Sequence, residues 1–261
     1  MKKYLLIVLL ISFLISGCKK SDNPDYSSLI PGTWVNTRVA DQEVLTDASF
    51  VMELRSDKVE VYSIGYKLDD NNKTWIENDK YSYSVKGNSI IFNGVGAFGG
   101  NFHIEFKILS VDELSLTFSV SKFLIDNEEY PDLKIYNCKK VTTDLRNQLV
   151  GTWYGKSTTP GNTDNSYHYW EYLADGNFNY YFQDSTGQWI RKPDNEGHYY
   201  LYGDLLSSNY SNDLLTGGSG KSFECWNINI IGTAMFWAGL RDNGQVTSFH
   251  MDKVAGPPIS R

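Results

Sequence analysis

The chain has 261 residues, a formal net charge of −7 at neutral pH and an aromatic content of 15%. This acidic balance excludes the basic surface with which proteins bind nucleic acid. The length is sufficient for two domains of ordinary size, and the abundant tyrosine, tryptophan and phenylalanine favour half-buried β-strands.

The N-terminus has the pattern of a secretory signal. Lys2 and Lys3 precede an apolar segment over 4–15, which is shorter than the roughly 20 residues of a membrane-spanning helix. The segment runs into Ile15-Ser16-Gly17-Cys18. This motif resembles the lipobox of bacterial lipoproteins, and the alternative is an ordinary signal peptide followed by an incidental cysteine.

The lipobox resemblance implies removal of residues 1–17 and acylation of Cys18 with fatty acids such as palmitate. Two or more acyl chains give stable membrane anchoring, whereas one chain holds only marginally. Residues 18–28 continue from this cysteine as a polar segment, which we interpret as a flexible tether. We therefore expect a lipid-anchored protein of the cell envelope, at the outer membrane, and surface display is an alternative to a location inside the envelope.

The first half of the remaining chain alternates polar and apolar residues with the period of β-strands. The alternation is clear over 59–64 and 81–85, and two further runs, 102–108 and 114–120, are separated by a short polar turn. Such short strands joined by turns are typical of an all-β sandwich or barrel.

The second half repeats this pattern after a short helical turn predicted over 144–149. Asp175-Gly176 separates two aromatic runs, 170–173 and 178–182, and an Asp-Gly pair in this position indicates a hairpin. The runs 226–231 and 234–240 predict another hairpin near the end of the chain.

An internal repeat relates the two halves in the same order. The segment 29–34 recurs as 148–153, 83–88 recurs as 199–204, and 136–141 recurs as 249–254. A repeat of this size indicates two copies of one structural unit. We predict a first domain over 29–142 and a second over 143–261.

Each unit resembles the lipocalin-like domains of Gram-negative bacterial lipoproteins, which are calycin-type barrels. The resemblance rests on Gly32-x-Trp34 and Gly151-x-Trp153 in the opening strands, and on Lys139 or Lys140 and Lys253 in the closing strands. It implies two tandem antiparallel β-barrels. It also implies that each tryptophan plugs the closed end of its barrel, covered by a basic residue, here Lys140 or its neighbour in the first unit. A lysine stands where the family more usually has arginine.

No motif in the chain points to catalysis, a metal or a cofactor. The four histidines are scattered, and no metal-binding, phosphate-binding or nucleophile motif is present. Cys138 and Cys225 fall in different repeat units, so buried free thiols are expected rather than a disulfide. We expect a monomeric protein that is not an enzyme.

Aromatic residues are densest in the second unit. Between Tyr167 and Tyr172 they must occupy both faces of one strand, so some rings lie outside the core. We predict ligand contacts at Trp170, Tyr172 and Tyr180, and at Trp75 and Trp189, which occupy corresponding long, polar connections. The alternative is that these rings cover a contact between the domains or a loop.

Two functions remain open at this point. A barrel of about eight strands can hold one small ligand or be filled by its own side chains. A barrel that holds a ligand favours a non-catalytic binding module for a small apolar or carbohydrate ligand. A barrel filled by its own side chains favours a structural or protein-interaction lipoprotein without a small-molecule ligand.

Overall fold

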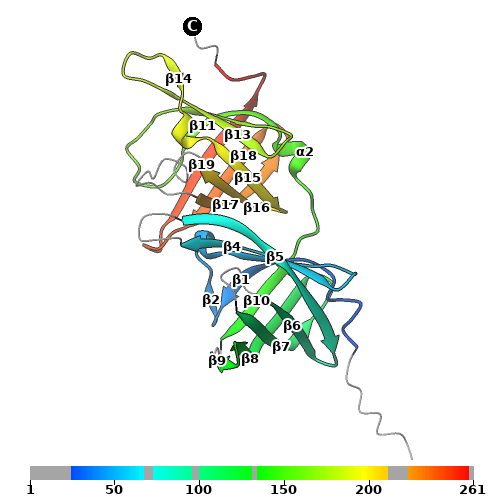
Figure 1. Cartoon of the computed structure of the whole chain (residues 1–261). Coiled ribbons are helices and arrows are strands. Elements are labelled where there is room, and N and C mark those ends of the chain that lie inside the picture. Colours follow the sequence, from blue (N-terminus) through cyan, green and yellow to red (C-terminus); the bar gives the residue numbers. More distant parts are fainter. Residues whose placement is uncertain (1–24, 68–72, 96–99, 131–133, 211–222, 259–261) are drawn as a thin grey trace, which may run out of the picture.

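The computed structural model describes residues 25–67, 73–95, 100–130, 134–210 and 223–258. In these residues the fold is all-β, and two closed eight-stranded antiparallel barrels follow one another along the chain (Figure 1). The two barrels, termed barrel 1 and barrel 2, confirm the predicted fold class and are consistent with a lipocalin-like fold. The predicted signal peptide over 1–17 and Cys18 lie outside the described residues. Within the described part of the chain, no helix is both long and apolar enough to cross a membrane.

Barrel 1 closes because β10 pairs with both β1 and β8. Its strands are β1 (Gly32–Val39), β3 (Phe50–Leu54), β4 (Val59–Lys67), β5 (Lys73–Lys86), β6 (Ser89–Val95), β7 (Asn101–Val111), β8 (Ser115–Ile125) and β10 (Ile135–Lys140). The short strands β2 (Gln42–Glu43) and β9 (Glu128–Glu129) pair with β1 and β8. A 3-10 helix, η1 (Thr46–Ala48), precedes β3.

Barrel 2 closes through the pairing of β12 with β13. Its strands are β11 (Gly151–Ser157), β12 (His168–Tyr172), β13 (Asn177–Gln183), β15 (Gly197–Tyr202), β16 (Leu205–Tyr210), β17 (Phe223–Ile231), β18 (Ala234–Leu240) and β19 (Val246–Val254). The helix α2 (Arg146–Leu149) confirms the predicted helical turn. Strand β14 (Trp189–Arg191) and the 3-10 helix η2 (Pro193–Asn195) belong to the long connection between β13 and β15.

The same tryptophan arrangement occurs at one end of each barrel. Trp34 and Trp153 are fully buried, and their indole Nε1 atoms donate to the carbonyl oxygens of Ile30 (2.8 Å) and Leu149 (2.7 Å). The Nζ of Lys140 lies 4.9 Å from the centre of the Trp34 ring. These end-of-barrel contacts are cation–π interactions, each adding about 0.5–2 kcal/mol according to its exposure.

The equivalent lysine of barrel 2, Lys253, lies 5.1 Å from the ring of Trp153. The glycine of each Gly-x-Trp motif makes room for this lysine. Gly32 and Gly151 have φ angles of +144° and +128°, and a Cβ on either residue would collide with the lysine Cε. Glycine is the residue best suited to such a backbone conformation, which explains why the motif recurs.

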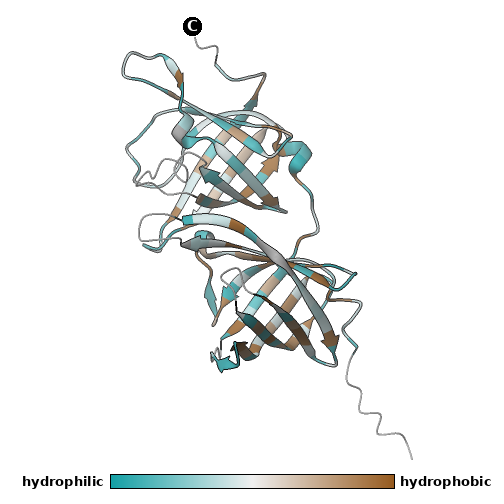
Figure 2. Ribbon diagram, viewed as in Figure 1, coloured by the Kyte–Doolittle hydropathy of each residue, from teal (hydrophilic) through white to brown (hydrophobic). Residues whose placement is uncertain are grey.

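Hydrophobic residues gather on the strands, while the turns are mainly hydrophilic (Figure 2). Each barrel has its own cluster of buried apolar side chains. A third buried cluster joins the barrels, and it consists of Val35, Val51, Trp75, Leu205, Phe223 and Cys225. The two described cysteines, Cys138 and Cys225, are buried free thiols.

Polar contacts reinforce this third cluster. Asn209 on β16 is buried, and its side-chain amide makes two hydrogen bonds with the backbone of Trp75 on β5. It accepts from the Trp75 N–H (2.7 Å) and donates to the Trp75 carbonyl oxygen (2.8 Å). Lys139, the neighbour of Lys140, pairs with Asp204 of barrel 2 at 2.6 Å. Barrel 1 therefore supports one outer wall of barrel 2, where cyan β5 runs beside β16 and β17 (Figure 1).

Candidate functional site

An open cavity of about 510 Å³ lies at the end of barrel 2 opposite Trp153. The aromatic rings of Trp226 on β17 and Phe249 on β19 form its floor. Its polar lining comprises Ser157, Thr159, Asn162, Asp164, Ser166, His168, Glu224, Arg241, Gln245 and Thr247. A concave site with an aromatic floor and several converging polar groups is the usual form of a small-molecule site.

Strand alternation brings the floor residues inward. Trp226 lies two residues before Ile228 on β17, and both belong to the buried core of barrel 2. The Trp226 ring packs against Trp237 with centroids 5.3 Å apart, and Phe249 packs edge-on against Trp226 at 5.5 Å. These contacts fix the rings before any ligand arrives, which lowers the entropic cost of binding.

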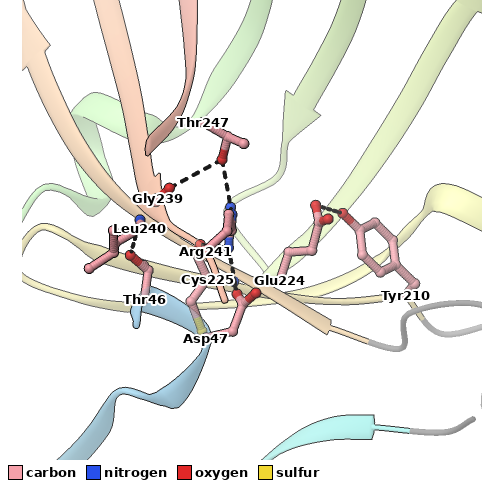
Figure 3. Close-up of polar contacts among 9 residues, drawn as sticks. All are labelled: Thr46, Asp47, Tyr210, Glu224, Cys225, Gly239, Leu240, Arg241 and Thr247. Carbon is pink, nitrogen blue, oxygen red and sulfur yellow. Dashed lines mark hydrogen bonds and ion pairs between the residues drawn. The ribbon is translucent and has the colours of Figure 1, made fainter. Parts of the chain in front are cut away.

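Arg241 covers the Trp226 ring, with its guanidinium carbon 4.2 Å from the ring centre. Its Nε donates to Thr247 Oγ1 (2.9 Å) and its Nη1 to the carbonyl oxygen of Cys225 (3.1 Å). Nη1 also pairs at 2.8 Å with Asp47, which belongs to η1 of barrel 1 (Figure 3). A residue of the first barrel therefore helps to position a lining residue of the second.

Gly239 makes this arginine position possible. It lies on β18 two residues before Arg241, and a Cβ there would lie 2.5 Å from the arginine Nη2. Any larger residue would push the guanidinium away from the Trp226 ring. The glycine is therefore required by the close approach of a side chain, not by a turn.

His168 contributes a neutral imidazole to the cavity. Its Nδ1 lies 2.7 Å from the hydroxyl of Tyr180. Burial lowers the pKa of His168, and burial raises the pKa of Tyr180 to about 12. At neutral pH the pair therefore consists of an uncharged imidazole and a protonated phenol, which share one hydrogen bond.

Two carboxylates complete the polar lining. Glu224 accepts a hydrogen bond from the Tyr210 hydroxyl (2.9 Å), whose pKa is raised by burial so that it keeps its proton (Figure 3). Asp164 lies on the connection between β11 and β12, and hydrogen bonds from Ser166 lower the pKa of its carboxyl. The cavity thus has acceptors on two sides of its aromatic floor.

The residues predicted to contact ligand fall in three separate places. Trp170, Tyr172 and Tyr180 point into barrel 2, and Trp170 packs against Phe249 at 5.6 Å. Trp170 and Tyr180 thus support the cavity from the side, while Tyr172 is buried deeper, with 1% of its surface exposed. None of these three side chains is among the described lining residues.

Trp189 lies on the outer surface of barrel 2. It packs edge-on against Tyr169 at 4.7 Å and lies 6.1 Å from Tyr154, which in turn stacks with Tyr167 at 4.9 Å. We call these four residues the outer aromatic cluster. Strand β12 therefore does carry aromatic rings on both faces, and its outer ring, Tyr169, packs against Trp189 of β14.

Trp75 does not lie in a polar connection, and that part of the prediction is wrong. It belongs to strand β5, has 1% of its surface exposed, and packs between the barrels against Tyr202 and Phe223. The correspondence between Trp75 and Trp189 inferred from the repeat fails because β5 extends to the contact between the barrels. Such a contact is not encoded in either unit's own strand pattern.

A second open cavity, of about 580 Å³, lies near the ends of β6, β7 and β8 in barrel 1. Five of its described lining residues are polar, and Phe102 is the one phenylalanine, tyrosine or tryptophan among them. The hydrogen bond between His103 and Asn93 (2.8 Å) already uses the imidazole Nδ1. We therefore regard the barrel 2 cavity as the stronger candidate site.

The sequence interpretation missed Trp226, Phe249, Arg241 and Glu224. A usable signal was present, because Met235, Trp237 and Gly239 alternate along the strand predicted over 234–240. Arg241 continues this alternation one residue past the end of the strand, which places an arginine on the inner face. Comparison with known proteins adds no assignment. No protein-family model matches the chain, and a search of curated proteins finds no relative.

Proposed function

We propose that the protein is a lipid-anchored binding module of the bacterial cell envelope, and that it takes a small apolar or carbohydrate ligand at the open end of barrel 2. The observation that carries the proposal is the cavity floored by Trp226 and Phe249 and lined by polar side chains. Binding without catalysis is proposed because three polar groups of the described lining are hydrogen-bonded to neighbouring side chains: His168 Nδ1 to Tyr180, Glu224 to Tyr210 and Arg241 Nε to Thr247. These three groups do not form a pair of nucleophile and base. The anchor is acylated Cys18, by the lipobox resemblance.

The proposed ligand site differs from the residues named on sequence grounds. It keeps Trp170 and Tyr180 as residues that support the cavity, and it replaces Trp75 and Trp189 by Trp226 and Phe249 as the contact residues. Large aromatic side chains that are already held in place are the usual anchors of a binding site.

A ligand screen on the soluble fragment 19–261 tests this proposal. Fatty acids, bile-type steroids, haem-like compounds and oligosaccharides are assayed by thermal shift and tryptophan fluorescence. We expect at least one class to raise the melting temperature and to shift the emission of Trp226. Phe249→Ala should then weaken affinity by more than about 1 kcal/mol. Trp189→Ala, which changes an aromatic ring outside the cavity, is the matched control.

Gly239→Ala offers a second test that leaves the aromatic floor in place. The added methyl group must displace the Arg241 guanidinium, so ligand affinity should change. Gly256→Ala, where an added Cβ meets no atom within 4 Å, should leave it unchanged. A ligand that binds all of these variants equally well would place the site elsewhere.

The second candidate function is protein interaction through the outer aromatic cluster. Tyr167 in this cluster is 40% exposed, and exposed aromatic rings with polar tips are enriched at protein interfaces. A broad screen without any stabilising compound would favour this function over the binding module.

A further inference from the structure

We infer that the ligand of the barrel 2 cavity is a neutral carbohydrate. This inference rests on the proposed function and narrows its two ligand classes to one. Two features of the cavity support it: the sign of its charges and the hydrogen-bonding capacity of its lining.

The charges of the lining disfavour an anionic ligand. Asp164 and Glu224 contribute carboxylates, whereas the one arginine or lysine among the described lining residues is Arg241, already paired with Asp47 at 2.8 Å. Charges in a partly enclosed site interact more strongly than in bulk water. A fatty acid or an acidic sugar would therefore be repelled, and a neutral ligand would not.

A cationic ligand fits the same charges but not the aromatic floor. Cations bind to aromatic residues over the open face of a ring. The guanidinium of Arg241 already occupies the face of Trp226, 4.2 Å from its centre. The arginine would also repel a second cation, which leaves a neutral ligand as the best match.

The lining can pair with hydroxyl groups at several positions. Glu224 and Asp164 supply acceptors, and the Nε2 of His168 makes no hydrogen bond with the described part of the chain. A hydroxyl group both donates and accepts, so it can pair with this imidazole in either tautomer. An apolar ligand would instead bury these polar groups without partners, which is unfavourable.

A further aromatic ring supports the floor of the cavity. Trp237 packs against Trp226 and Phe249 and is 4% exposed. The CH face of a sugar ring can pack on Phe249, as apolar surface packs on aromatic rings.

Titration of the soluble 19–261 fragment with three kinds of probe tests the inference. The probes are neutral oligosaccharides of glucose, xylose and N-acetylglucosamine, oligogalacturonate as an acidic sugar, and laurate as a fatty acid. We expect a neutral oligosaccharide to bind and to lose affinity in Phe249→Ala. The acidic sugar should bind at least about tenfold more weakly because of Glu224 and Asp164, and laurate should not bind.

The variant Glu224→Gln removes one cavity charge and keeps the shape of the side chain. It should weaken the binding of the neutral oligosaccharide by about fivefold or more, because a charged acceptor makes the stronger hydrogen bond. It should also narrow the difference in affinity between neutral and acidic sugars. Glu171→Gln is the matched control, since Glu171 accepts hydrogen bonds from Asn179 and Tyr181 and does not line the cavity.

The outcomes separate this inference from the proposed function. Laurate binding that is lost in Phe249→Ala, with no oligosaccharide binding, overturns the carbohydrate inference and retains the binding module. A neutral oligosaccharide that binds Glu224→Gln and wild type equally also overturns it. Failure of every probe to bind rejects the carbohydrate inference, and the binding module is rejected as well if the steroids and haem-like compounds of the wider screen also fail to bind.

Discussion

The carboxylate of Asp47 in barrel 1 lies 2.8 Å from the guanidinium of Arg241 in barrel 2, and the same carboxylate accepts a hydrogen bond from the backbone N–H of Cys225 (2.7 Å). One residue before it, Thr46 Oγ1 accepts from the N–H of Leu240 (2.8 Å). The 3-10 helix η1 thus contacts the rim of barrel 2 next to the cavity (Figure 3). Docking of barrel 1 and the geometry of the cavity are therefore physically connected.

Replacement of Asp47 by alanine should affect both stability and binding. Arg241 is 9% exposed and would be left with an unneutralised charge, so we expect a loss of about 1–3 kcal/mol in the free energy of unfolding. Ligand affinity should change as well, because the guanidinium loses one of its fixed partners. Urea denaturation and ligand titration measure the two effects. Asp57→Ala, which removes an exposed pair with Arg55, should cost less than about 0.5 kcal/mol.

Replacement of Trp153 by alanine should destabilise barrel 2 by about 3–5 kcal/mol, the usual range for deletion of a large buried aromatic side chain. Trp34→Ala should have the same effect on barrel 1, since both indoles are fully buried, hydrogen-bonded and covered by a lysine. Hydrogen exchange measured residue by residue shows which barrel loses protection. Equal loss of protection in both barrels from either variant would mean that they unfold as one unit.

A buried carboxyl in barrel 1 should make stability depend on pH. Glu60 on β4 is 5% exposed, and burial raises its pKa from 4.5 to about 8. Because the folded chain keeps the proton while the unfolded chain loses it, the free energy of unfolding should fall as pH rises from 4.5 to about 8. The slope contributed by this group is at most about 1.4 kcal/mol per pH unit, and the contribution levels off above the folded-state pKa.

Glu60→Gln should remove this dependence. The variant should equal wild type in stability near pH 4 and exceed it at pH 8, as measured by urea denaturation across the pH range. Glu53→Gln, at an exposed position of the neighbouring strand β3, is the control and should follow wild type. A wild-type stability that rises between pH 5 and pH 8 by way of Glu60 would contradict the expected sign.

Cys18→Ala tests the proposed lipid anchor. Wild type should partition with membranes and carry fatty acid by mass, because two or more acyl chains hold a protein stably at a bilayer. The variant should be found in the soluble fraction of cells. A variant that sediments with membranes as wild type does would show that acylation of this cysteine is not what holds the protein there.

Local pattern was enough to predict two all-β units, and the lipocalin-like resemblance of their Gly-x-Trp motifs predicted that the units are barrels. The recurrence of Gly-x-Trp, the alternation of strand residues and the helical turn over 144–149 all depend on neighbours in the chain, and the structure has β1, β11 and α2 at these positions. Whether Lys139 or Lys140 covers Trp34 could be decided only from the three-dimensional structure. Lys140 lies over Trp34, while Lys139 reaches Asp204 of the other barrel.

The candidate site was less predictable because its residues meet only after both barrels have formed. Trp75 is an aromatic residue of the kind that contacts ligands, but it lies in the contact between the barrels. Its backbone is held there by the side chain of Asn209, from a distant part of the chain. Arg241 directly follows an apolar strand, and its interior position depends on Gly239, Trp226 and Asp47 together. No single segment contains that arrangement.

The most direct test of the central claim is a crystal structure of the 19–261 fragment in complex with the tightest compound from the screen. The account predicts ligand density at the open end of barrel 2, in contact with Phe249 and the Trp226–Arg241 pair and within hydrogen-bond distance of Glu224 or His168. Density on the outer aromatic cluster around Trp189, or inside barrel 1, would contradict it.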